Sequence, residues 1–287
     1  KKDDELNLLL KQKNVSLITM DVTSQKDFGK LGSGYDHVYH LAAINGTENF
    51  YKIPDQVIKV GAVGTINVLE WFYSKNKQGK LLFASSSESY AGLVKLLGKK
   101  FPIPTPENVP LIIDDPSNVR WSYAASKILG EVAMFSWAKK YGSNSFVIVR
   151  YHNVYGPRMG TDHVIPQFIQ RILAKENPFR IFGAENTRSF CYVADAIAAT
   201  ELIMNSNETN GQIIHIGRSD AETKIIDLAK TLFKVAGYEA EIKVEPAPQG
   251  AVSKRCPDVS KLLQLGFKPQ ISLQEGLRRT HEWYEQH

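Results

Sequence analysis

The chain has 287 residues, of which 43% are hydrophobic and 23% are charged, and this composition is typical of a globular protein. Its 35 basic and 30 acidic residues are spread along the chain without a basic cluster, so we expect no nucleic-acid partner. No uncharged apolar run approaches the roughly 18 residues of a membrane span. Cys191 and Cys256 make neither a disulfide framework nor a zinc site, so we expect reduced, buried thiols in a cytoplasmic protein. The seven histidines include no HxxxH or HxH pair, so we expect no metal site, and we expect no membrane partner.

Short apolar runs alternate with longer amphipathic stretches along the chain. The short runs predict strands, in chain order, over Val15–Met20, His37–Leu41, Leu81–Ser86, Ser145–Arg150 and Gln212–Ile216. The longer stretches predict helices over Asp55–Asn76, Tyr123–Tyr141, Pro166–Ala174, Val193–Met204, Thr223–Val235 and Leu273–Tyr284. Strands that are apolar on both faces and alternate with helices indicate a parallel sheet covered by helices on both sides.

Ligands of such a sheet bind beyond the carboxyl ends of the strands, and the residues there are informative. The small residues Ala42, Ala43 and Ile44 follow one predicted strand and would let a flat ligand approach the backbone. The next strand ends in Ser85–Glu88, and the one after it is followed by Tyr151–Arg158. Polar groups therefore gather where this kind of fold places its chemistry.

Tyr123 and Lys127 are four residues apart, which places them on one face of a helix. There the ammonium group could lower the pKa of the phenol from about 10 and make it a base at neutral pH. Tyr73 and Lys77 have the same spacing, but they lie at the end of a predicted helix, and we interpret them as structural. A hydroxyl such as that of Ser86, the Tyr123 phenol and the Lys127 ammonium form a proton relay suited to oxidising a secondary alcohol.

Several motifs follow one another along nearly the whole chain: HLAA (His40–Ala43), VGTINVLE (Val63–Glu70), SSSE (Ser85–Glu88), YAASK (Tyr123–Lys127), RYHNVYGPR (Arg150–Arg158), RSFCYVADA (Arg188–Ala196) and LGFKP (Leu265–Pro269). In this order they resemble the extended short-chain dehydrogenase/reductases, the family of the NAD-dependent nucleotide-sugar epimerases, dehydratases and decarboxylases. The resemblance implies a Rossmann-like doubly wound parallel sheet with a smaller C-terminal substrate lobe. The NAD-binding domain would comprise residues 1–157 with 190–217, and the substrate lobe residues 158–189 with 218–287.

Members of that family open with a strand, a glycine-rich turn and a helix, whose backbone amides hold the NAD pyrophosphate. Gly29, Gly32 and Gly34 do not supply that turn, because they follow no apolar strand. We therefore expect that the chain is an N-terminally incomplete form of a longer protein and lacks the first βαβ unit of the sheet.

Position by position, the resemblance assigns Ser86, Glu88, Tyr123 and Lys127 to catalysis. It implies that NAD is bound by Asp21, Val22, Leu41, Ala42, Ala43, Tyr123, Lys127 and Tyr151. It implies that a nucleoside-diphosphate sugar is bound by Ser87, Asn153, Val164, Arg188 and Arg255. Gly61 departs from the family pattern, which usually has Asn there, and this puts a structural hydrogen bond in doubt rather than the chemistry.

Enzymes of this family first oxidise the sugar, usually at C4, and the residue at the position of Glu88 bears on the fate of the keto-sugar. Simple 4-epimerases have a small, non-acidic residue there, and dehydratases of the dTDP-glucose kind have an Asp-Glu pair at the positions of Ser87 and Glu88. The Ser-Glu pair of this chain is similar to UDP-glucuronate decarboxylases and to GDP-mannose-type dehydratases. The resemblance thus implies an NAD-dependent nucleotide-sugar epimerase or dehydratase, with a UDP-glucuronate decarboxylase-like enzyme as the alternative.

A non-catalytic NAD-binding relative is a further alternative, but such proteins usually carry a damaged Tyr-Lys pair, and the pair is intact here. The helices predicted over Asp55–Asn76 and Tyr123–Tyr141 have apolar residues on more than one face. In the resembling family these two helices pair with their copies as a four-helix bundle, so we expect a homodimer.

Overall fold

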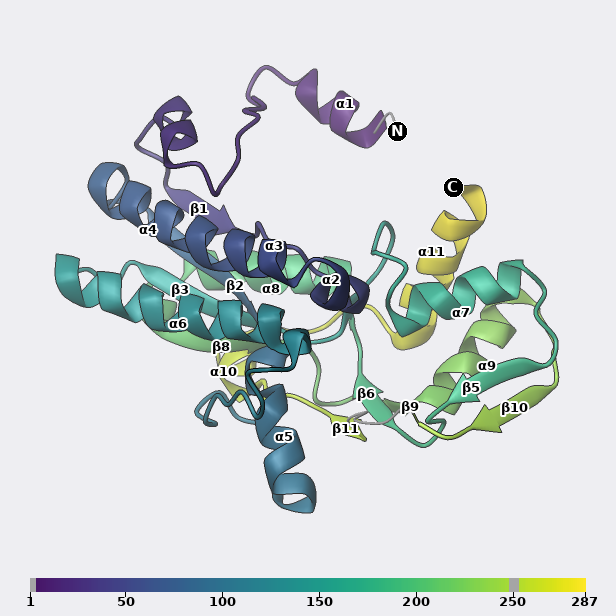
Figure 1. The fold of residues 1–287 in the computed structure, drawn as a ribbon. Coiled ribbons are helices and arrows are strands. Elements are labelled where there is room, and N and C mark those ends of the chain that lie inside the picture. Colours follow the sequence, from purple (N-terminus) through teal and green to yellow (C-terminus); the bar gives the residue numbers. More distant parts are fainter. Residues whose placement is uncertain (1–3, 248–252) are drawn as a thin grey trace.

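The computed structural model describes residues 4–247 and 253–287, and a four-stranded parallel sheet lies at its centre (Figure 1). The strand order is β1–β2–β3–β8, with β1 at His37–His40, β2 at Lys80–Ser86, β3 at Phe146–Tyr151 and β8 at Gln212–Ile216. These strands match four of the five predicted ones to within one residue at each end. The prediction of an α/β fold with a parallel sheet is confirmed.

The prediction of a strand at Val15–Met20 is wrong, because these residues have no regular secondary structure. A strand requires a neighbour that accepts and donates its backbone hydrogen bonds, and no strand of the described residues pairs with this segment. Leu17 and Ile18 stay 62% and 40% exposed as a result. Local β propensity was therefore not sufficient to form a strand here.

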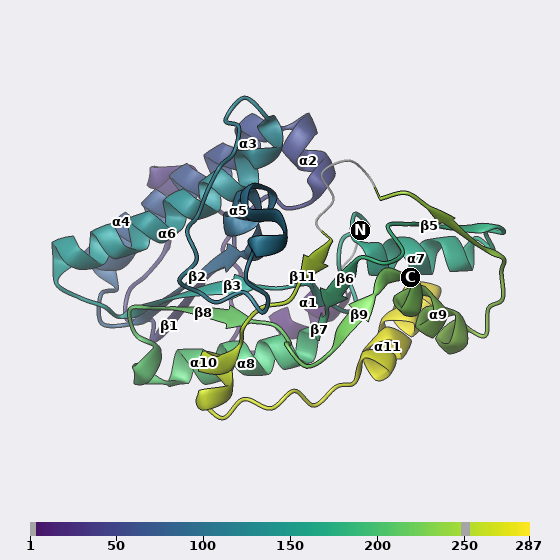
Figure 2. The same cartoon turned by 90° about the horizontal axis from the view of Figure 1, so that it is seen from below.

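Helices cover both faces of the sheet (Figure 2). On one face lie α3 (Pro54–Ile58), the π-helical turn η2 (Lys59–Val63), α4 (Gly64–Lys75) and α6 (Ser122–Tyr141). On the other face lie α8 (Val193–Asn205) and α10 (Ser260–Gln264). Successive side chains of β2 point to opposite faces of the sheet, so the strand contacts both helix layers. Leu81 and Phe83 pack against α4 and α6, whereas Leu82 packs toward α8.

The C-terminal elements have an apolar core of their own, which includes Phe168, Phe179, Leu228 and Leu277. This core lies between three helices, α7 (Val164–Leu173), α9 (Ile225–Ala236) and α11 (Leu273–Gln286), and the parallel pair of β5 (Phe179–Phe182) with β10 (Ile242–Glu245). A second small sheet is formed by β6 (Thr187–Ser189), β9 (Glu222–Lys224) and β11 (Lys254–Arg255). The division of the chain into a cofactor domain and a substrate lobe at the predicted boundaries stays a prediction.

Two-residue strands β4 (Val154–Tyr155) and β7 (Cys191–Tyr192) pair where the chain leaves the central sheet and where it returns. The remaining elements are short: α1 (Asp4–Leu10), η1 (Gln25–Lys30), α2 (Thr47–Lys52), η3 (Ser87–Tyr90), α5 (Ala91–Leu97), η4 (Gly98–Lys100), η5 (Val119–Trp121) and η6 (Asn207–Thr209). Both cysteines are free and buried, as expected. Within the described ranges, no helix combines the length and the apolar character that crossing a membrane would require.

The helix predicted over Asp55–Asn76 is present but is divided into α3, η2 and α4. Its π-helical turn contains Gly61, which faces Ser126 of α6. A Cβ atom at Gly61 would lie 2.4 Å from the Ser126 hydroxyl oxygen, so only glycine permits this close approach of the two helices. The departure of Gly61 from the family pattern is therefore accommodated by tight helix packing.

Candidate active site

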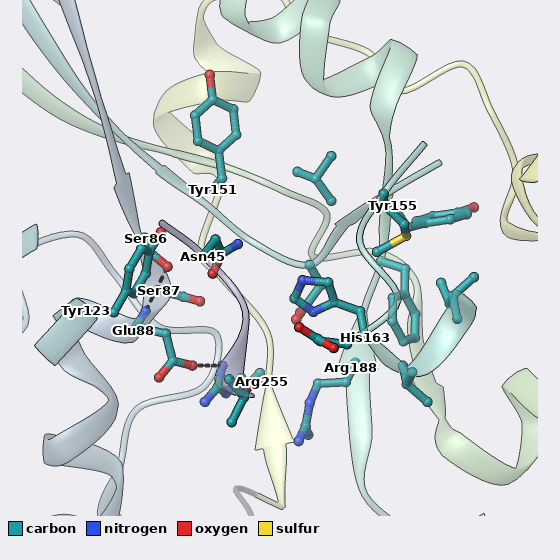
Figure 3. Close-up of a pocket in the computed structure, with 18 of the residues that line it drawn as sticks. Asn45, Ser86, Ser87, Glu88, Tyr123, Tyr151, Tyr155, His163, Arg188 and Arg255 are labelled. Carbon is teal, nitrogen blue, oxygen red and sulfur yellow. Dashed lines mark hydrogen bonds and ion pairs between the residues drawn. The ribbon is translucent and has the colours of Figure 1, made fainter. Parts of the chain in front are cut away.

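A cavity of about 690 Å³ lies beyond the carboxyl ends of β2 and β3, between the central sheet and the C-terminal elements (Figure 3). Most of the predicted site residues line it: Leu41, Ala43, Ser86, Ser87, Glu88, Tyr123, Lys127, Tyr151, Asn153, Val164, Arg188 and Arg255. Three predicted cofactor residues, Asp21, Val22 and Ala42, are not part of its lining. The fold thus brings the predicted catalytic and substrate residues to one place from distant parts of the chain.

Tyr123 lies in the first turn of α6 and is almost fully buried. Its ring stacks on that of Phe50 from α2, with centroids 4.9 Å apart and an interplanar angle of 14°. Burial raises the pKa of Tyr123 to about 12, and a hydrogen bond with the Ser86 side chain acts in the opposite direction. The stacking fixes the phenol beside Ser86, so its hydroxyl is oriented before any ligand binds.

Lys127 follows Tyr123 by one helical turn and is 3% exposed. Its Nζ donates a hydrogen bond to the carbonyl oxygen of Ala84, 2.6 Å away, and lies 5.4 Å from the centre of the Tyr123 ring. Burial lowers the pKa of Lys127 to about 8. Burial dominates the pKa of Tyr123 in this structure, and the lowering of that pKa by Lys127 stays a prediction.

Glu88 is held between two arginines from different parts of the molecule. Its carboxylate lies 2.6 Å from Nη1 of Arg255 and 3.3 Å from Nη2 of Arg120. Burial would raise the pKa of Glu88, but the two guanidinium groups outweigh it and hold that pKa below its ordinary value. Glu88 is therefore an ionised group at neutral pH. It lies two residues from Ser86, in η3, and its backbone N–H donates to the Ser86 hydroxyl oxygen.

Arg188 and Arg255 lie opposite each other in the register of the parallel strands β6 and β11. Burial, together with the neighbouring charge of Arg255, lowers the pKa of Arg188 to about 10, while Glu88 acts in the opposite direction. Arg255 also pairs with Glu88, but each guanidinium group has five N–H donors, so the two side by side suit a group with several anionic oxygens. A diphosphate is such a group.

Several lining residues were missed by the sequence analysis, among them Asn45, Arg120 and Asp162. Arg120 had a detectable signal, because it precedes Tyr123 by three residues and so lies one helical turn away. Asn45 directly follows the small residues after β1. Asp162 had no such signal, since only the folding of the loop before α7 brings it to the cavity.

The residues present fit one end of an NAD molecule. Ala43 has a small side chain, Lys127 has ammonium protons beyond the one given to Ala84, and Tyr151 lines the same cavity. They could hold the nicotinamide and its ribose. Across residues 4–247 and 253–287, no strand of the central sheet leads through a glycine-rich turn to a helix, so a pyrophosphate site of that kind is not among the described elements.

Relatives at moderate identity match almost the whole chain. It is 32% identical over 283 residues to the UDP-N-acetyl-alpha-D-glucosaminuronate decarboxylase of Bacillus cytotoxicus, which covers 95% of this chain and 84% of the relative. It is 33% identical over 251 residues to UDP-glucuronic acid decarboxylase 3 of Arabidopsis thaliana, covering 86% and 69%. Thus each of these two relatives is matched over more than two thirds of its length.

A solved structure of the same fold is that of the UDP-glucuronic acid 4-epimerase from Bacillus cereus in complex with UDP-glucuronic acid and NAD. It superposes with a TM-score of 0.81 at 26% identity and covers 99% of this chain and 85% of that one. The model of the NAD dependent epimerase/dehydratase family matches residues 2–217. The chain therefore belongs to the NAD-dependent epimerase/dehydratase family, and it is an NAD-dependent enzyme of the nucleotide-sugar kind that its motifs resemble.

Proposed function

We propose that the protein oxidises C4 of a UDP-linked uronic acid sugar and then removes the sugar's carboxyl group as CO2. The observation that carries this proposal is Glu88, an acidic residue inside the cavity beside Ser86 and Tyr123 and between two arginines. A plain 4-epimerase needs no such group, because its keto-sugar only rotates. The UDP-uronate decarboxylases among the relatives support the substrate class and the reaction.

In this proposal Tyr123 reacts as the phenolate, which the neighbouring Lys127 ammonium and the positive charge of bound NAD would favour, so the phenol first releases its own proton to solvent. The phenolate then takes the proton of the C4 hydroxyl, and the Ser86 hydroxyl holds the sugar oxygen beside it. When bound, NAD supplies the acceptor for the C4 hydride and later returns it. The carboxylate on C5 then lies β to a ketone, so the C5–C6 bond can break, CO2 leaves, and the electron pair is held as an enolate. C5 then takes a proton that comes from solvent, and the ionised Glu88 carboxylate orients the water that delivers it. Tyr123 returns the proton it took to the C4 oxygen at the final reduction.

The binding residues have corresponding roles in the proposal. Lys127, Tyr151, Leu41 and Ala43 hold the nicotinamide end of NAD, to which Asp21, Val22 and Ala42 add contacts outside the cavity. Arg188 and Arg255 bind the diphosphate, and the remaining substrate contacts come from Ser87, Asn153 and Val164. The substrate lobe would consist of residues 158–189 and 218–287.

The test is incubation of the purified full-length enzyme with NAD and a panel of UDP-, dTDP-, GDP- and CDP-sugars, followed by mass spectrometry. Loss of the mass of CO2 from a UDP-uronate supports the proposal. Loss of the mass of water would instead identify a dehydratase, and a new sugar of unchanged mass a 4-epimerase, as in the superposed Bacillus cereus structure. Either of these results would overturn the decarboxylase proposal.

We further propose a homodimer formed by the outer face of α3, η2, α4 and α6. The large apolar side chains exposed on this face are Ile58, Val63, Leu129, Val132 and Phe135. The last three are spaced by three residues on α6 and form one stripe, with Val132 60% exposed. Light scattering should give a dimer for the native protein and a monomer for Val132→Glu. A cytoplasmic role in polysaccharide biosynthesis is part of the same proposal.

A further inference from the structure

Arg120 is fixed on the catalytic side of the cavity independently of any ligand. It lies in η5, which leads directly into the first turn of α6. Its backbone N–H donates to the side-chain oxygen of Asn118 over 3.1 Å, and its guanidinium group stacks 4.7 Å over the ring of Trp121. These contacts place the charge one helical turn from Tyr123, the proposed base at C4.

The two contacts of Glu88 are unequal. Arg255 approaches it at 2.6 Å, whereas Arg120 approaches at 3.3 Å through Nη2. Arg120 keeps 29% of its side chain exposed and lines the cavity. A guanidinium group binds a carboxylate best through two parallel hydrogen bonds, and the single long contact does not use that capacity. The geometry of Arg120 therefore suits a second carboxylate that enters the cavity.

We propose that Arg120 determines specificity by binding the carboxylate on C5 of the sugar, and that this carboxylate displaces Glu88 from Arg120. The inference rests on the proposed function, because it assigns the acidic group of the same substrate. The C5 substituent is one carbon from the C4 hydroxyl that Tyr123 would contact, and Arg120 and Tyr123 are neighbours on one helical face. Arg188 lies beside Arg255 in the register of β6 and β11, and Arg255 can donate N–H groups other than the one that contacts Glu88 to the diphosphate.

The exchange of partners has a consequence for the reaction cycle. While the uronate is bound, Glu88 keeps Arg255 but loses Arg120, and it is free to act near C5. When the carboxyl group leaves as CO2, the substrate no longer carries the charge that held Arg120. Arg120 then returns to Glu88, and the neutral product sugar is held less tightly than the substrate was.

Calorimetry with UDP-glucuronic acid and UDP-glucose tests this assignment, in a Tyr123→Phe background so that neither ligand is consumed. The parent should bind the uronate more tightly than the neutral sugar. Arg120→Met should weaken the uronate by about 10- to 100-fold, the usual loss for a hydrogen-bonded charge, and leave UDP-glucose unchanged. The affinity of Arg120→Lys for the uronate should lie between those of the parent and Arg120→Met. Arg180→Met should change neither affinity, because Arg180 is exposed and outside the cavity lining.

Equal weakening of both sugars by Arg120→Met, or an unchanged preference for the uronate, would overturn the assignment. Glu88→Gln provides the second arm: it should strengthen uronate binding, because the competing carboxylate is gone, and weaker binding would contradict the displacement. The outcomes also separate the two proposals. If the native enzyme releases CO2 but Arg120→Met keeps its preference for the uronate in calorimetry, only the role of Arg120 is refuted. If Arg120→Met loses that preference but the native enzyme releases no CO2, only the decarboxylase reaction is refuted.

Discussion

Two arginine–carboxylate clusters lie near the carboxyl end of β2, and they differ in what surrounds them. Glu131 accepts hydrogen bonds from Arg150 at 2.7 and 2.9 Å and from the Ser85 hydroxyl at 2.5 Å, and both charged side chains are at most 3% exposed. Glu88 lies in the cavity wall, where it and its two arginine partners are 19% to 29% exposed. The Glu131 cluster is shielded from solvent and both of its carboxylate oxygens accept hydrogen bonds, whereas the Glu88 cluster is accessible from the cavity and can exchange partners.

The same helix connects the two environments. Tyr123, Lys127 and Glu131 are spaced by four residues and form one stripe along α6, from the cavity into the interior. Neighbouring serines of β2 divide in the same way: Ser85 hydrogen-bonds Glu131, whereas Ser86 lines the cavity. One end of the stripe therefore lies beside a buried charge pair in the interior, and the other end lies at the cavity where we propose that the reaction takes place.

The largest effect is expected at the cavity end of the stripe. Tyr123→Phe removes the proposed base and should lower turnover by about 10²- to 10⁴-fold, with little change in binding of the sugar nucleotide. Tyr73→Phe is the matched control, since Tyr73 has the same spacing to a lysine but packs in the core beside Tyr141. Steady-state kinetics of both variants measure the difference, and full activity of Tyr123→Phe would exclude the proposed mechanism.

The next largest effect is expected at the interior end. Glu131→Gln leaves the guanidinium group of Arg150 buried without its counter-charge, so the free energy of unfolding should fall by about 3–5 kcal/mol. Urea denaturation measures this loss. Glu185→Gln, which breaks an exposed pair with Lys224, should leave the midpoint nearly unchanged. Equal midpoints for the two variants would show that burial does not distinguish the clusters.

Glu88→Gln should separate stability from function. Both arginine partners face the cavity and can be solvated, so the loss of stability should be less than half of that in Glu131→Gln. In a single turnover the variant should form NADH and then stall, because the step after C4 oxidation lacks its carboxylate. NADH absorbance monitors this directly. Turnover within a few-fold of the parent would leave the 4-epimerase as the better function.

The smallest effect concerns pH. The folded-state pKa of Glu88 lies below its ordinary value of 4.5, so the ionised carboxylate stabilises the fold above that pH. This contribution is lost as the pH falls through the lowered, folded-state pKa. The stability difference between the parent and Glu88→Gln should therefore be constant near neutral pH and should shrink only below pH 4.5. A difference that already declines between pH 7 and pH 5 would contradict the arginine-held carboxylate.

Sequence patterns predicted much of this architecture but not its charge pairs. The helix predicted over Tyr123–Tyr141 extends over Ser122–Tyr141, and the predicted strand Gln212–Ile216 agrees at both ends. The ion pair of Glu88 with Arg255 joins residues 167 positions apart, and no local pattern connects them. Nothing in the sequence pattern distinguished Glu131, which is buried, from the many solvated acidic residues, because burial depends on what packs against a helix face.

By itself, the sequence determined the alternation of apolar strands and amphipathic helices, the pairing of Tyr123 with Lys127 on one helix face, and the family to which the motifs belong. These depend on residue types at short spacings, where chain geometry alone sets which side chains are neighbours. Only the tertiary structure decided that Glu88 is shared between Arg120 and Arg255, and that residues 15–20 form no strand. Both outcomes depend on which distant segment the fold places next to these residues. The hydrogen bonds between strands and the ion pairs each need a partner that the local sequence does not contain.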